Sequence, residues 1–153
     1  MRTLILLILI TVCYAGYNLL IKVSGSHTGS VNTAPILATM ALQASAFGVS
    51  VAYLIYLTQQ NASVTLPGKA FIWAVGAGVC IGLAEILYFY LFRGFAEDKP
   101  VAGSVAIPFV VGGTIVISVL VSVLAFGEPL KPVQWLGVVL AFSGMILLAF
   151  SPG

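Results

Sequence analysis

Five long apolar stretches, separated by short polar breaks, make up most of this sequence. They cover residues 3–22, 35–57, 70–92, 101–126 and 132–150. An α-helix needs about 20 apolar residues to cross the hydrocarbon core of a bilayer, and each stretch is close to that length. None of them shows the strict alternation of apolar and polar positions that a membrane β-strand requires. The pattern therefore predicts an all-α, polytopic membrane protein with five transmembrane helices.

The polar breaks contain residues that commonly end or begin helices. Residues 24–30 form a run of small polar side chains, which we interpret as the first loop. Thr33 followed by Pro35 is typical of an N-cap residue with a proline in the first helical turn. All the breaks are too short to hold a second domain, so we expect a single domain over residues 1–153.

Composition supports this interpretation and excludes two classes of function. Hydrophobic residues make up 61% of the chain and charged residues only 7%, against about 45–50% and about 25% in soluble domains. So few charges cannot cover the surface of a small soluble enzyme. Six basic residues scattered singly, with a net charge of +2, form no patch that binds nucleic acid. The two cysteines, Cys13 and Cys80, fall inside predicted helices, so we expect no disulfide framework, metal site or cofactor.

Polar residues recur at helical spacing inside the apolar stretches. Thr11, Tyr14 and Asn18 follow this spacing in the first stretch, Gln43 belongs to a similar row in the second, and Ser118 to one in the fourth. Each such residue is costly in hydrocarbon unless it faces protein or water. The rows therefore indicate either hydrogen bonding between helices or the lining of a common cavity, and both alternatives stay open.

Glu85 is the one acidic residue well inside an apolar stretch. An ionised carboxylate at such a depth costs about 2.5–3.5 kcal/mol on insertion scales. A residue of this kind normally marks a binding site or an ion pathway. A structural role is the alternative, in which a protonated Glu85 donates a hydrogen bond to a neighbouring helix or an ionised one pairs with a base from a loop.

Small residues form a face on the fifth stretch. Gly137, Ala141 and Gly144 recur at intervals of three or four residues, and such faces allow helices to approach closely. They are candidates for a dimer contact, and packing within one chain is the other interpretation.

Several motifs together resemble one family of membrane proteins. They are Leu-Ala-Glu-Ile-Leu-Tyr-Phe-Tyr-Leu-Phe-Arg at 83–93, Pro-Phe-Val at 108–110, Phe-Gly-Glu-Pro-Leu at 126–130, Gln-Trp-Leu-Gly at 134–137, and Gly144. This set resembles the repeat of the drug/metabolite transporter superfamily, the EamA-like domain in particular. The first stretch is also similar to small multidrug resistance proteins through residues 19–24, although Tyr14 stands where those proteins have their coupling carboxylate.

The resemblance implies an architecture. Most EamA-like transporters contain two five-helix repeats that are inverted relative to each other, whereas this chain contains one. A single repeat implies pairing with a second, antiparallel copy. The first, third and fourth helices of each copy would then line a central cavity, with Thr11, Tyr14, Asn18, Glu85 and Ser118 as lining candidates.

The distribution of basic residues fits such a pairing. Three of them fall on the side of the amino terminus and three on the other side: Arg2, Lys69 and Lys131 against Lys22, Arg93 and Lys99. Since an excess of Lys and Arg normally selects the cytoplasmic side, a balanced chain is expected to insert in both orientations.

Three functional hypotheses follow. The first is a secondary transporter in a bacterial or archaeal plasma membrane, which moves small metabolites or drug-like solutes as an antiparallel homodimer, with Glu85 for proton coupling. The alternative is an accessory subunit of a heteromeric transporter. An intramembrane enzyme is disfavoured, because the sequence shows no Ser/His or paired-carboxylate constellation and its single histidine, His27, falls in a loop.

Overall fold

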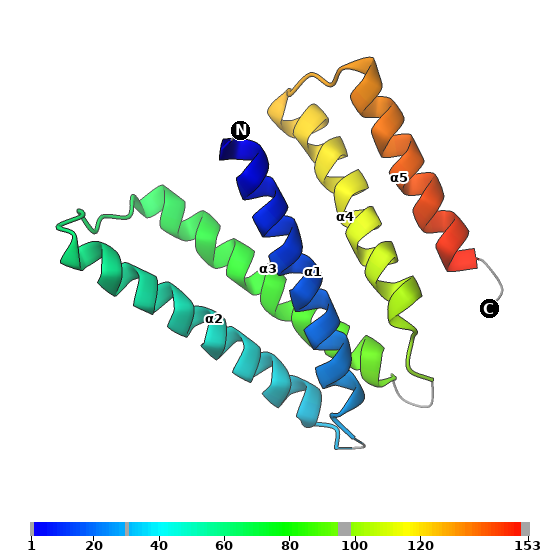
Figure 1. Ribbon diagram of the computed structural model, residues 1–153, viewed down its shortest axis with the longest axis horizontal. Helices are drawn as coiled ribbons and strands as arrows, with labels where there is room; N and C mark the ends of the chain where they lie inside the picture. The colour runs from blue at the N-terminus through cyan, green and yellow to red at the C-terminus, as the bar shows by residue number, and fades with distance from the viewer. Residues whose placement is uncertain (1, 30, 95–98, 151–153) are drawn as a thin grey trace. The chain divides into compact units, whose positions relative to one another are not determined.

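The computed structural model consists of five α-helices. It describes residues 2–29, 31–94 and 99–150. The helices are α1 (Arg2–Ser26), α2 (Ala34–Gln59), α3 (Gly68–Arg93), α4 (Gly103–Phe126) and α5 (Pro132–Phe150) (Figure 1). No β-strand occurs in these three ranges, and the predicted all-α class with five helices is confirmed.

Four of the helices, α1 to α4, are long and apolar enough to cross a membrane. The apolar part of α5, Pro132–Leu148, is shorter than these four, so its role as a fifth span stays a prediction. Large apolar side chains are exposed along all five helices, with Trp73 80% and Leu124 81% exposed. An exposed apolar surface of this extent is unfavourable in water and fits a multi-pass membrane protein.

The helix ends lie within a few residues of the predicted ones, with one clear correction. Residues 24–26 belong to α1 and not to the first loop. In this turn the Ser26 hydroxyl donates to the Val23 carbonyl at 2.7 Å, and Gly25 is buried. Thr33 does occupy the N-cap position of α2, but its side chain makes no capping hydrogen bond.

The chain divides into two compact units, of which the first runs from Met1 to Pro100 and contains α1, α2 and α3. Its buried residues gather where α1 ends, α2 begins and α3 ends, and Figure 1 shows these three helix ends meeting. They are Asn18, Ile21, Gly25, Pro35, Thr39, Glu85, Tyr88, Phe89 and Phe92. In the other half of the unit the described residues are half-buried or exposed. Packing in this unit is therefore concentrated at one end.

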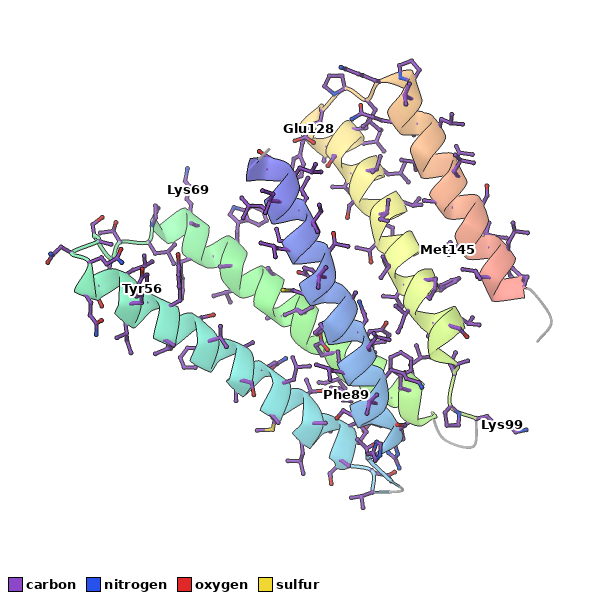
Figure 2. All side chains as sticks on the ribbon, viewed as in Figure 1. Tyr56, Lys69, Phe89, Lys99, Glu128 and Met145 are labelled. Carbon is purple, nitrogen blue, oxygen red and sulfur yellow. The ribbon has the colours of Figure 1, made fainter. Side chains whose placement is uncertain are left out.

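Gly25 of α1 lies very close to α3. A Cβ atom at this position would lie 2.8 Å from the Cβ of Phe92 and 3.5 Å from the carbonyl oxygen of Phe89. Only glycine leaves room for this crossing. The Phe89 side chain, labelled in Figure 2 where α1 crosses α3, is 1% exposed.

The second unit, Val101–Gly153, contains α4 and α5. The two helices are in close contact at Gly112 of α4 and Met145 of α5, because a Cβ added at Gly112 would lie 3.1 Å from the Cβ of Met145. Met145 is labelled in Figure 2. At Gly137 and Gly144 an added Cβ would meet nothing within 4 Å. Gly137 and Gly144, the two glycines of the predicted small-residue face, are therefore not in close contact with α4. A contact of this face with a second copy stays a prediction.

We predict that the Gly25→Ala variant is destabilised while Gly48→Ala is not. The added methyl group at Gly25 overpacks the crossing with Phe92, which costs about 1–3 kcal/mol. At Gly48 the Cβ meets nothing within 4 Å, so alanine gains about 0.5–1 kcal/mol of helix propensity. Thermal unfolding in detergent, followed by circular dichroism, measures both. A Gly25→Ala protein as stable as the Gly48→Ala protein would contradict the close crossing.

Candidate functional site

Glu85 lies on the buried face of α3. Glu85, Tyr88, Phe89 and Phe92 are spaced three or four residues apart, so they share one side of the helix. The Glu85 side chain is only 1% exposed, which places it among the most completely buried side chains that the structure describes. An acidic residue therefore lies in the packed end of the first unit.

One oxygen of this carboxyl group, Oε2, is buried without any hydrogen-bond partner. No basic side chain in the ranges described forms an ion pair with Glu85. A buried polar atom without a partner is costly, and its presence in a folded protein calls for an explanation. Both interpretations of Glu85, as a site residue and as a structural residue, stay predictions.

Asn18 and Tyr88 connect α1 to α3 beside Glu85. The Tyr88 hydroxyl donates to Oδ1 of Asn18 at 3.0 Å, and the Asn18 amide donates to the Tyr14 carbonyl at 2.8 Å. Both side chains are almost completely buried, at 7% and 8% exposed. Tyr88 follows Glu85 by three residues, which places the phenol and the carboxyl group on adjacent turns of the same face. Asn18 therefore takes part in a hydrogen bond between α1 and α3, and its role in a pathway stays a prediction.

Gln43 brings α2 to the same part of α3. Its side-chain nitrogen lies 3.2 Å from the position of a Cβ at Gly82, three residues before Glu85. Thr39, one turn away on α2, is 2% exposed, and its hydroxyl donates to the carbonyl of Pro35 in its own helix. We refer to Asn18, Gln43, Glu85 and Tyr88 as the polar cluster, in which Gln43 is exposed and lies beside Gly82 while the other three side chains are buried. It takes side chains from all three helices of the first unit.

The other sequence-predicted residues lie outside this cluster. The Thr11 hydroxyl donates to the Leu7 carbonyl of its own helix at 2.8 Å, so its polar group is satisfied locally. The Tyr14 side chain is 63% exposed and packs edge-on against Tyr17, and only its carbonyl reaches Asn18. Ser118 is exposed on α4, in the second unit.

A second group of contacts, not expected from the sequence, closes the packed end. Arg93 donates from Nε to the Gly29 carbonyl at 2.9 Å and from Nη2 to Oδ1 of Asn32 at 3.1 Å. The Tyr90 hydroxyl donates to the Asn32 carbonyl at 2.9 Å. The last turn of α3 is thus hydrogen-bonded to the loop between α1 and α2. The only signal in the sequence was the spacing of Tyr90 and Arg93, three residues apart at a helix end.

The chemistry of the polar cluster is that of one carboxyl group, one phenol and two carboxamides. Such a set binds a proton or a cationic group at the carboxyl oxygen and orients it through neutral hydrogen bonds. Within the described ranges, no three His, Cys, Asp or Glu residues lie together in a way that could hold a metal ion. Cys13 and Cys80 are exposed free thiols.

A scan against protein-family models, a search of the curated proteins and a search of the solved structures found no match.

We predict a measurable coupling between Asn18 and Tyr88. In a double-mutant cycle of Asn18→Ala and Tyr88→Phe, the interaction energy should be about 0.6 kcal/mol and at most about 1.7 kcal/mol, as for hydrogen bonds between membrane helices. The control cycle pairs Asn18→Ala with Tyr53→Phe, because Tyr53 lies exposed on α2. Unfolding in detergent measures all variants, and equal coupling in the two cycles would contradict the α1–α3 hydrogen bond.

Proposed function

We propose that this protein is a secondary transporter of small solutes and that Glu85 binds the coupling proton and the solute in turn. One observation carries the proposal: a carboxyl group sits almost completely buried on an apolar helix, with one oxygen lacking a hydrogen-bond partner. Intramembrane carboxyl groups of this kind typically mark proton relays and substrate sites. The hydrogen-bonded neighbours Asn18 and Tyr88 add a polar surface beside it.

We further propose that the chain is a single EamA-like repeat that functions as an antiparallel homodimer. The resemblance of residues 83–93 and 126–130 supports the family, and the five-helix architecture agrees with one repeat. Gly137 and Gly144, which have open space beside them on α5, are suited to a close contact between copies. In a pair of inverted repeats, the solute site lies at the interface of the two copies.

The proposed mechanism uses one site for two ligands. Binding of a cationic solute stabilises the ionised form of Glu85 and displaces its proton. Reprotonation from the opposite side of the membrane neutralises the carboxylate and releases the solute. Each ligand therefore shifts the occupancy of the other, which is the requirement for antiport.

We predict that Glu85→Gln abolishes proton-coupled transport. Glutamine keeps the size and hydrogen bonding of glutamate but cannot titrate. The variant should insert into proteoliposomes at the parental level and yet lose uptake of a fluorescent lipophilic cation driven by a pH gradient. Glu85→Asp should retain part of the uptake with a shifted pH profile, because the shorter acid still exchanges protons.

The matched control is Glu128→Gln, which removes an exposed acid from the loop between α4 and α5. It should transport at the parental rate. Uptake by Glu85→Gln at the parental rate, with the parental pH dependence, would assign Glu85 a structural role only. Repeating the assay with an imposed sodium gradient distinguishes the coupling ion.

The dimer predicts dual topology. Reporter fusions placed after Gly153 should give both cytoplasmic and exterior signals, because three basic residues fall on each side. Moving one or two lysines should fix each chain in one orientation, and transport should then require both fixed forms together. A uniform signal from one side would favour the heteromeric alternative, in which this chain needs a different five-helix partner.

A further inference from the structure

A groove of about 590 Å³ runs between α1 and α2, within the first unit and apart from the polar cluster. Small and large side chains of both helices line it together with Phe89 of α3, and the large ones are Tyr17, Leu20, Ile21 and Leu42. The α1 wall extends from Cys13 past Gly16 to Ser24, and the α2 wall from Ala38 past Ala41 to Ser45. A Cβ atom added at Gly16 would meet nothing within 4 Å. The space at Gly16 is therefore open, and the remaining lining is mostly apolar.

The lining contains no charged residue, and its polar side chains are those of Cys13, Tyr17, Ser24 and Ser45. The Ser45 hydroxyl donates to the Ala41 carbonyl of its own helix at 2.8 Å, so it presents no free donor. Ligand sites of about 300–1,000 Å³ with apolar walls bind apolar groups. A charged solute would find no counter-charge here, which separates this groove from the site at Glu85.

The dimensions restrict the occupant further. Cys13 and Ser24 are about 16 Å apart along α1, since each residue of a helix rises 1.5 Å. The groove thus follows α1 for about three turns, a length that suits one extended alkyl chain.

We propose that the groove binds one acyl chain of a membrane phospholipid, an inference that rests on the proposed membrane placement of α1 and α2. The surfaces that flank it are apolar and exposed, with Leu20 on α1 and Leu37 on α2 among them. In a bilayer, acyl chains surround these surfaces. A chain seated between α1 and α2 fills the groove, and it gains dispersion contacts that an empty groove would forfeit. It also contacts Phe89, which shares a helix face with Glu85.

The proposal is tested with substitutions that fill the groove from α1 or from α2. Ala41→Phe and Gly16→Leu each place a larger side chain in it, and Ala44→Phe is the matched control, because Ala44 is exposed on α2 but does not line the groove. The full-length protein is incubated with phosphatidylglycerol in mild detergent, and native mass spectrometry measures the lipid bound per chain. In vesicles that contain spin-labelled phosphatidylcholine, electron paramagnetic resonance measures the immobilised fraction.

Parental protein and Ala44→Phe should retain one phospholipid per chain. Excluding as few as two methylene groups should weaken retention about tenfold in Ala41→Phe and Gly16→Leu. Glu85→Gln should retain lipid at the parental level, so loss of transport and loss of lipid binding are separate outcomes. Equal retention in all variants would overturn the proposal. So would a change from dimer to monomer in Ala41→Phe with lipid binding unchanged, because it would identify a second copy as the occupant.

Discussion

Satisfaction of backbone hydrogen bonds within each helix is the constraint on which this structure depends. In apolar surroundings no water pairs with an exposed N–H or C=O group, so each segment forms a complete helix by itself. Apolar side chains then gain little by leaving lipid for a neighbouring helix. Contacts between helices consequently form where backbones approach closely, as at Gly25, or where polar side chains pair, as Asn18 does with Tyr88.

These contacts explain why one end of the first unit is packed while its other end is open. The crossing at Gly25, the Asn18–Tyr88 hydrogen bond and the bonds of Arg93 to the α1–α2 loop all lie within the same few turns. Glu85 is the first buried residue of α3 in this region, followed by Tyr88, Phe89 and Phe92. Its burial is thus a consequence of where α1 and α3 meet, and its unpaired oxygen is what remains when polar neighbours bond to each other.

The sequence predicts the helices well and the site in part. Apolar stretches separated by polar breaks determine the number and order of helices, because length and hydropathy suffice for that. Glu85 and Asn18 could be selected because a carboxyl and an amide group are costly in an apolar helix. Tyr88 was not selected, since an aromatic residue near the end of a span also fits an interfacial anchor. Its role depends on a partner 70 residues away, and no local pattern encodes that distance. The same holds for Gly25, which lies in a run of small polar residues typical of a loop, while its close neighbour Phe92 is 67 residues away.

The closeness of α1 and α3 at Gly25 also has a mechanical consequence. Arg2, at the start of α1, is about 35 Å from Gly25 along the helix axis. A rotation of α1 by only about 5° around this crossing therefore displaces its far end by about 3 Å. Asn18 is only about 10 Å from Gly25 along the same axis, so a displacement of about 1 Å beside Asn18 and Tyr88 corresponds to a movement of about 3 Å at the opposite end of the helix.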